Sequence, residues 1–252
     1  MKLSMITSFA TLEYSLEDSI KIIAEQGYDG VDIGAFWPHA DPDVMDKERR
    51  KKVRELMNSY SLKPAALATA GLGIADMCLI VREASVQYDI KCLDLASDLG
   101  FTRMEALGGW VWRQLGIPFE KAWAISVENI KRVSKHAEEV GVTLAMEFEP
   151  TLPLLPQNLT QLKKFIDEVG SPYCKANLDV GHCNVRTACV TEEQIRDLKG
   201  YIVHAHINDN TGDADQNWLP GLGTTPYKRL LRILDEIGYD GYLAVELEAA
   251  PH

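Results

Sequence analysis

A junction between a helix and a strand recurs along the chain, and it constrains the fold more than any other feature of the sequence. In each copy a helical pattern closes on an acidic residue and a glycine, and a short apolar run follows. Glycine is favoured just past the last turn of a helix because it adopts the left-handed backbone there at little cost. Each junction therefore predicts a helix, its cap and a buried strand. The copies are AEQGYDGVDI, SDLGFTRMEAL, EEVGVTLAMEF, DEVGSPYCKANLD and DEIGYDGYLAVEL.

Stretches with apolar residues at helical spacing lie between the predicted strands, for example around Ile20 and Ile23. Residues that favour a helix start precede several of these stretches. They include Ser15 before the first, Asp41 with Pro42 before the second, and Thr191 before the sixth.

Eight strands are predicted, and they alternate with the helical stretches. Strict alternation implies parallel strands joined by crossover helices. Eight such units match a (β/α)8 TIM barrel that forms a single domain over residues 1–252. An open doubly wound sheet is the alternative, but no GxGxxG motif follows the first strand. The strands are predicted at residues 3–7, 30–33, 63–68, 103–107, 143–148, 174–179, 201–207 and 242–247.

The last predicted strand is followed by only a few residues up to His252, so a full eighth helix does not fit there. We expect the N-terminal segment, a partner subunit or nothing to cover that part of the barrel. A homo-oligomer is the expected assembly.

Charge and cysteine content narrow the class of function. The chain has 26 Lys and Arg against 37 Asp and Glu, and its formal net charge of −11 disfavours nucleic acids and anionic membranes as partners. Its five cysteines form no CxxC pair, which argues against a disulfide framework or a thiolate zinc site and fits a reducing cytoplasm. No stretch approaches the roughly 18 apolar residues of a membrane span. We expect a soluble, cytoplasmic protein.

Predicted strands five to eight each finish with a side chain that can bind a metal. In a closed barrel the C-terminal ends of neighbouring strands converge on one pocket, so residues distant in sequence can meet around one ion. Four buried acceptor groups in one pocket would be costly without a cation to neutralise them. Carboxylates with one imidazole suit a divalent ion, Mn²⁺ first, with Mg²⁺, Co²⁺ or Zn²⁺ as alternatives. The four residues are Glu147, Asp179, His206 and Glu246.

The chain resembles the sugar isomerase and epimerase superfamily, which has the xylose-isomerase-like TIM barrel. The motifs that carry the resemblance are short, but their order and spacing extend over nearly the whole chain. They are GYDGVDI, GVTLAME, LDVGH, HAHINDN, LPGLGTTPY and GYLAVELE. The superfamily includes ketose 3-epimerases, hydroxypyruvate isomerases, inosose-processing enzymes and, more distantly, endonuclease IV.

The resemblance implies roles for individual residues. It implies that Glu147, Asp179, His206 and Glu246 hold the metal, that the two glutamates also act as an acid/base pair, and that His182 contacts the substrate. A metal bound to a carbonyl and an adjacent hydroxyl stabilises an enediolate, and one glutamate on each face can remove and return a proton. We expect a metal-dependent isomerase or epimerase of a small sugar or keto-polyol.

One departure from the ketose 3-epimerases concerns arginine. Those enzymes generally carry arginines after the strand-five glutamate and after the strand-seven histidine. This chain reads EFEPTLPLL and HINDNTGDADQ at those places, with no arginine in either. The departure argues against a strongly bound phosphate.

Further candidates each have a structural alternative. His204 shares the orientation of His206, so it contacts substrate or ligand, or else it is a hydrogen-bonded core histidine. Asp209 bonds a ligating imidazole or a substrate hydroxyl, or it forms an Asx-type turn. Trp112 forms an aromatic wall for a sugar or packs within its loop. Glu149 ligates metal or forms a salt bridge in a loop.

Other functions remain open at this point. A metal-dependent dehydratase or lyase could use the same enediolate to expel a β-hydroxyl, and an ultraviolet-absorbing product would identify it. An apurinic-site endonuclease needs more histidines than this chain supplies, and the net charge opposes DNA binding. A non-catalytic sugar-binding subunit would keep its ligands and show no turnover.

Overall fold

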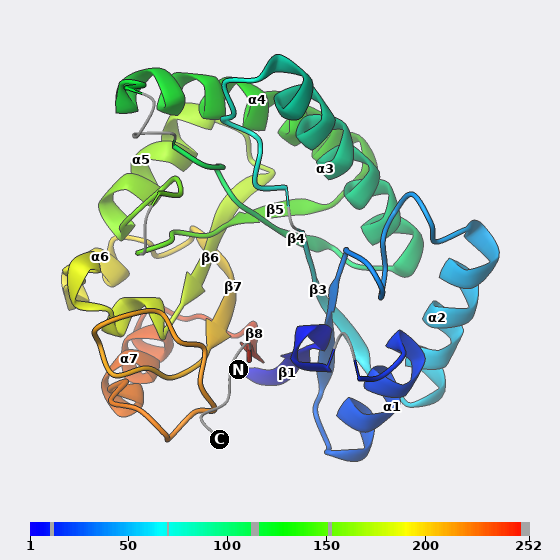
Figure 1. The fold of residues 1–252 in the computed structure, drawn as a ribbon. Helices are drawn as coiled ribbons and strands as arrows, with labels where there is room; N and C mark the ends of the chain where they lie inside the picture. The colour runs from blue at the N-terminus through cyan, green and yellow to red at the C-terminus, as the bar shows by residue number, and fades with distance from the viewer. Residues whose placement is uncertain (11–12, 70, 112–115, 151–152, 248–252) are drawn as a thin grey trace.

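Eight parallel strands close into a barrel in the order in which they follow along the chain (Figure 1). The predicted (β/α)8 barrel is therefore confirmed. The computed structural model describes residues 1–10, 13–69, 71–111, 116–150 and 153–247. The strands are β1 Lys2–Ile6, β2 Gly30–Gly34, β3 Lys63–Ala68, β4 Arg103–Ala106, β5 Thr143–Met146, β6 Cys174–Asp179, β7 Ile202–Ile207 and β8 Tyr242–Val245.

Helices form a ring around the barrel, and each covers the outer side of the strands next to it (Figure 1). The apolar faces of these helices and of the strands make one continuous core. The helices are α1 Leu16–Glu25, α2 Lys47–Ser59, α3 Leu79–Leu99, α4 Phe119–Val140, α5 Leu159–Val169, α6 Glu192–Arg196 and α7 Tyr227–Glu236. Short 3-10 turns occur at Thr7–Ala10, His182–Asn184 and Arg186–Ala188.

Local capping chemistry sets most of the helix ends. All five glycines of the recurring junction adopt a positive φ, as the cap requires: Gly27, Gly100, Gly141, Gly170 and Gly238. The hydroxyl of Ser15 accepts a hydrogen bond from the Asp18 amide at 3.0 Å, and Thr191 with Gln194 forms a capping box.

The predicted start of the second helix was wrong. Asp41 and Pro42 lie in a turn, where the Asp41 carboxylate accepts from the Asp43 amide at 2.9 Å. The helix begins five residues later, with Asp46 as its N-cap accepting from the Arg49 amide at 2.8 Å. Each aspartate side chain accepts a hydrogen bond from a nearby backbone amide, as aspartate does both in turns and at helix N-caps. Only the tertiary contacts of the segment therefore decide which aspartate starts the helix.

Strands β5 and β8 end earlier than the sequence predicted. As a result Glu147 and Glu246 lie just past their strands rather than within them. The backbone amide of Glu147 still donates to the Ala106 carbonyl at 3.1 Å, and that of Glu246 donates to the Ile207 carbonyl at 3.2 Å. Each glutamate is therefore fixed to the neighbouring strand although it has left the regular ladder.

No helix follows β8 among the described residues, which end at residue 247. The N-terminus lies between α1 and α7 (Figure 1). At this place an apolar groove of about 550 Å³ runs over the outer side of β1 and β8. Its lining includes Leu3, Met5, Tyr28 and Val245.

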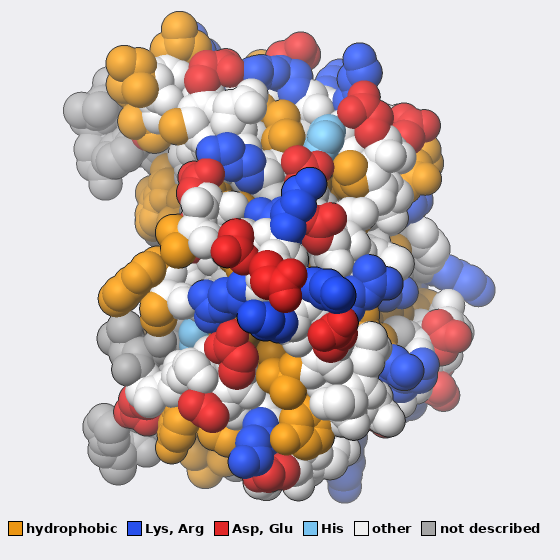
Figure 2. Space-filling view, turned by 90° about the vertical axis from the view of Figure 1, so that its right-hand side faces the viewer, with side chains coloured by type: hydrophobic (Ala, Val, Ile, Leu, Met, Phe, Trp, Pro, Cys, Tyr) orange, Lys and Arg blue, Asp and Glu red, His pale blue; other side chains and the backbone are white. Residues whose placement is uncertain are grey.

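On the face over α2 and α3, basic and acidic side chains lie next to each other (Figure 2). Ion pairs link neighbouring elements there, for example Arg50 with Asp98 at 2.9 Å. Within the described part of the chain, no helix has the length and hydropathy that a membrane crossing needs.

One buried carboxylate outside the barrel interior gives a prediction about stability. Asp89 on α3 is 1% exposed, and burial raises its pKa to about 8. Because the folded state holds this proton more tightly than the unfolded chain, stability is fully present below about pH 4. It then falls as pH rises toward 8. We expect Asp89→Asn to remove this loss of stability with rising pH.

Chemical denaturation from pH 4 to 9 tests the prediction. The variant should gain on the wild type as pH rises, by at least about 2 kcal/mol at pH 8. Asp98→Asn, an exposed carboxylate on the same helix, is the control and should change stability by less than about 1 kcal/mol at every pH. Parallel pH profiles for wild type and Asp89→Asn would contradict the prediction.

Candidate metal centre and active site

The four side chains predicted to meet at the barrel mouth do meet. Each of Glu147, Asp179, His206 and Glu246 offers one ligand atom, and these atoms all lie within 4.8 Å of one another. The first three are at most 2% exposed, and Glu246 is 9% exposed. Asp179 and His206 are direct partners in the β6–β7 register, which brings their side chains together without any loop. Four consecutive strands thus supply the cluster.

The imidazole of His206 lies between the two glutamates. Its Nδ1 is 3.2 Å from an oxygen of Glu246 and 3.4 Å from one of Glu147. Its Nε2 lies 3.7 Å from an oxygen of Glu105 on β4. Nδ1 is therefore the nitrogen that faces the cluster.

Hydrogen bonds hold Asp179 in place from both sides. One oxygen accepts from the His182 backbone amide at 2.7 Å, and the other accepts from the side-chain amide of Asn208 at 2.6 Å. A carboxylate with this much support keeps one orientation toward the cluster.

Crowding of buried carboxylates shifts their proton affinities. Burial, together with the charges of neighbouring carboxylates, raises the pKa of Asp179 to about 7 and that of Glu105 well above its ordinary value. Burial alone would raise the pKa of Glu246 as well, but the charge and hydrogen bond of His206 hold it below the usual range. Burial opposes the charging of His206, yet the three surrounding glutamates raise its pKa well above the ordinary value.

These residues fit a divalent cation. The donor set is oxygen-rich with one imidazole nitrogen, which suits Mn²⁺, Mg²⁺, Co²⁺ or Zn²⁺. One oxygen of Glu147 is buried and has no hydrogen-bond partner, so it has a free lone pair. Among the described residues the only ion-pair partners of Glu147, Asp179 and Glu246 are histidines. A dipositive ion would offset the repulsion that the carboxylates now impose on one another.

A cavity of about 250 Å³ adjoins this cluster, because Glu147 and Glu246 belong to its lining. Its polar lining residues include Glu105, Glu147, His182, Asp215 and Glu246. Its apolar lining residues are Ile6, Phe36, Ala68, Leu72, Leu107, Trp110 and Leu154. This volume admits a small polyhydroxylated molecule, which has both carbons and hydroxyls to contact such a lining.

His182 lies in the lining of this cavity, but both of its ring nitrogens are occupied. Nδ1 is 2.9 Å from the carbonyl oxygen of Phe148, and Nε2 is 3.0 Å from an oxygen of Asp215. A carbonyl oxygen only accepts, so Nδ1 is a donor there. Three nearby carboxylates, of Asp179, Glu149 and Asp215, raise the pKa of His182 well above its ordinary value against the opposing effect of burial.

His204 is not among the described residues that line the cavity. It is fully buried, its Nε2 is 2.7 Å from an oxygen of Asp32 on β2, and its ring packs edge-on against that of His206 with 5.3 Å between centroids. A contact between His204 and the substrate stays a prediction. Its packing against His206 supports the ring that faces the metal cluster.

Asp209 organises the loop after β7. Its carboxylate accepts from the backbone amides of Asn210, Gly221 and Thr225 at 2.8–2.9 Å. These bonds use both oxygens and tie the start of the loop to its end, and none of them is the bond to the second following amide that defines an Asx turn. Trp112 lies outside the described residues, while the neighbouring Trp110 lines the cavity.

Glu105 and Asp215 line the cavity and Asp32 pairs with His204, and the sequence did not single out any of the three. Glu105 in β4 and Asp32 in β2 each stand between two apolar residues, and in a strand such neighbours point to the opposite side. A charged residue within an otherwise apolar strand was therefore a signal that the sequence offered. Asp215 comes from an irregular loop, and no sequence signal places it beside His182.

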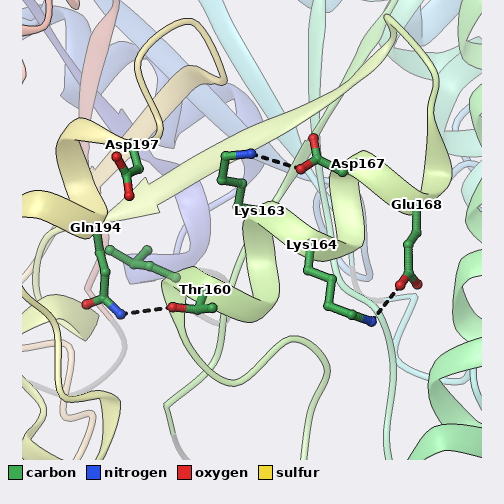
Figure 3. A pocket seen from close by; sticks show the side chains of 8 residues that line it. Thr160, Lys163, Lys164, Asp167, Glu168, Gln194 and Asp197 are labelled. Atoms are coloured by element: carbon green, nitrogen blue, oxygen red, sulfur yellow. Dashed lines mark hydrogen bonds and ion pairs between the residues drawn. The ribbon is translucent and has the colours of Figure 1, made fainter.

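Figure 3 shows a second hollow, on the outer surface between α5 and α6. Its charged side chains already pair with each other: Lys163 with Asp167 at 2.9 Å, and Lys164 with Glu168. Gln194 donates to the Thr160 hydroxyl at 2.9 Å. A groove whose polar groups satisfy one another gives no indication of a ligand.

Comparison with known proteins was consistent with this geometry. The model of the xylose isomerase-like TIM barrel family matches residues 20–252. The chain is 24% identical to fructoselysine 3-epimerase of Escherichia coli O157:H7, over 92% of this chain and 85% of that protein. It is 25% identical to L-ribulose 3-epimerase of Mesorhizobium japonicum, over 96% of this chain and 79% of that protein. A crystal structure of a D-tagatose 3-epimerase-like protein superposes with a TM-score of 0.85 at 22% identity, covering 98% of this chain and 91% of the other.

Proposed function

The chain belongs to the xylose isomerase-like TIM barrel family, and from that premise we propose that it is a metal-dependent epimerase or isomerase of a small ketose or keto-polyol. The observation that carries the proposal is the convergence of Glu147, Asp179, His206 and Glu246 next to a cavity of about 250 Å³ that Glu147 and Glu246 line. The named relatives, sugar epimerases and isomerases, support the same reaction class.

Glu147, Asp179, Glu246 and Nδ1 of His206 would hold the ion. When bound, a divalent ion supplies Lewis-acid polarisation of the substrate carbonyl and its neighbouring hydroxyl. Asn208 and the backbone amide of His182 fix Asp179, and His204 supports the ring of His206. Glu105 lies within 3.7 Å of His206 Nε2 and is placed to orient that ring.

Glu147 and Glu246 would move the protons. They approach from β5 and β8, which are not neighbours in the barrel, so they can address opposite faces of a substrate carbon. One carboxylate takes the proton from the carbon next to the carbonyl, which leaves an enediolate. The other, protonated at the start, donates its proton to the opposite face and ends ionised. The centre is then inverted, whereas return of the proton to the adjacent carbon would interconvert aldose and ketose.

Exchange of substrate protons in deuterated water tests this function. We expect the Mn²⁺-loaded protein to incorporate solvent deuterium at the carbon next to the carbonyl of at least one ketose, observed by proton NMR. A broad panel of ketoses with no deuterium at any carbon would overturn the proposal. An ultraviolet-absorbing unsaturated product would instead assign a dehydratase, which shares the first proton transfer.

Four further expectations belong to the proposal. Mn²⁺ is the expected ion, which metal analysis of the purified protein tests. A homo-oligomer is expected because no helix covers β8 in the described part of the chain, and sedimentation velocity measures the assembly. Cytoplasmic location and a single domain over residues 1–252 complete the set.

A further inference from the structure

The polar wall of the cavity carries far more acidic than basic groups. Five described residues in its lining are carboxylates, and no described lining residue is Lys or Arg. Three of them, Glu105, Glu147 and Glu246, surround His206 at the proposed metal site. The remaining two, Glu149 and Asp215, lie together at another part of the wall.

Glu149, Asp215 and His182 form what we call the acidic subsite. One ligand atom from each lies within 4.8 Å of the others. Two carboxyl groups face a single imidazole there, and no described Lys or Arg lines the cavity beside them. Both ring nitrogens of His182 are already occupied, by Phe148 and by Asp215, so the imidazole has no donor left for a ligand.

Unpartnered acceptors at this wall point to a ligand that brings donors. The second oxygen of Asp215 is shielded from solvent and has no hydrogen-bond partner. Asn217, which is 4% exposed and also lines the cavity, has a side-chain oxygen that is likewise unpartnered. Buried polar atoms without partners are uncommon, and a bound ligand is one of the usual reasons for them.

Anionic ligands do not suit this wall. A phosphate or carboxylate group would meet Glu149 and Asp215 without any described Lys or Arg to pair with it. A neutral hydroxyl donates once, so it would satisfy only one of the two unpartnered acceptors. An ammonium group supplies up to three donors, and its hydrogen bonds to carboxylate oxygens are charge-assisted.

The subsite lies next to the proposed metal centre. The ring of His182 is 3.8 Å from Glu147 and 3.9 Å from Asp179. A group bound there is therefore attached close to the reacting carbonyl, within a few covalent bonds. We propose that the acidic subsite binds an ammonium group, so that the substrate is a ketose with an amine on a carbon near its carbonyl. This inference rests on the proposed function for its substrate class.

Binding of unreactive polyols tests the subsite without turnover. The probes are 1-amino-1-deoxy-D-glucitol, its N-acetyl derivative and D-glucitol, titrated calorimetrically into the metal-loaded protein. The acetyl derivative keeps the skeleton and removes the charge. We expect the amine to bind at least tenfold more tightly than both neutral probes. Equal or weaker binding of the amine would overturn the inference.

Two variants of the same loop separate the charge of the subsite from its shape. Asp215→Asn keeps the size of the side chain and should reduce the tenfold preference for the amine to less than about twofold. A general distortion of the cavity would weaken all three probes together and leave their ratio unchanged. Asp213→Asn is the control, because Asp213 is exposed and pairs with Arg186 outside the cavity. It should keep the full preference, and an unchanged ratio in Asp215→Asn would count against the subsite.

Turnover distinguishes failure of the inference from failure of the proposed function. We expect 1-amino-1-deoxy-D-fructose to exchange its proton with a kcat/KM at least tenfold above that of D-fructose. Exchange of neutral ketoses without any amine preference would overturn the subsite and keep the function. Tight binding of the aminopolyol with no exchange from any ketose would overturn the proposed function and keep the subsite. Preference for a phosphorylated or carboxylated ketose would overturn the subsite.

Discussion

Replacement of Glu246 by glutamine should lower the rate of proton exchange by at least about 10³-fold, because the amide can neither accept nor return the proton. The substitution keeps the size of the side chain, so the barrel should stay folded. Glu246 faces His206 Nδ1 at 3.2 Å, and loss of its charge also removes one proposed ligand. Single-turnover deuterium exchange by NMR, with the metal content of the same sample, measures both effects.

The two roles of Glu246 separate at saturating metal. If the variant regains full metal occupancy but stays slow, the lost step is proton transfer rather than metal binding. Glu236→Gln on α7 is the matched control, since this glutamate is 43% exposed and pairs with Arg196 far from the cavity. The control should retain the wild-type rate. Exchange by Glu246→Gln within a few-fold of wild type would rule out an acid/base role.

Removal of the ion should have an effect of at least similar size. A chelator should abolish exchange, and Mn²⁺ should restore it, because the carbonyl is no longer polarised without the ion. The ion also binds the folded state only, so saturation at 100 times Kd stabilises the protein by about 2.7 kcal/mol. For a domain of this size that corresponds to a rise in Tm of about 5–10 °C.

Asp179→Asn tests the same prediction with a variant that lacks one of the proposed metal ligands. Asp179 is fully buried and held by Asn208 and the His182 amide, so its loss should remove the metal-dependent rise in Tm. Asp235→Asn on the exposed side of α7 should show the full rise. A chelated protein with unchanged Tm and unchanged exchange would refute metal dependence.

The arrangement of the barrel could be predicted because its signals are local. A glycine past a helix must take positive φ to end the helix there, and all five glycines of the recurring junction do so. Once eight parallel strands are inferred, closure of the barrel brings the C-terminal ends of β5, β6, β7 and β8 together. The meeting of Glu147, Asp179, His206 and Glu246 followed from that topology and from their positions at strand ends.

The roles of the neighbouring polar residues were not predictable in the same way. The spacing of His204 and His206 predicted a shared orientation, but only the tertiary structure puts the ring of His206 between two glutamates and that of His204 against Asp32. The register shifts by one position between Val31 and Asp32, and again between Ala176 and Asn177. Such irregularities change which residues face each other, and no alternation rule locates them.

By itself the sequence determined the barrel, the order of its strands and the four residues that converge at its mouth. Backbone preferences and chain topology set these features, and neither depends on which side chains lie nearby in the folded protein. Only the tertiary structure decided that Asp32 would pair with His204, that Glu105 would approach His206 and that Asp215 would lie against His182. These contacts join residues 33 to 172 positions apart, and the last of them joins a 3-10 turn to an irregular loop. Packing of the whole interior, rather than any local preference, sets their distances.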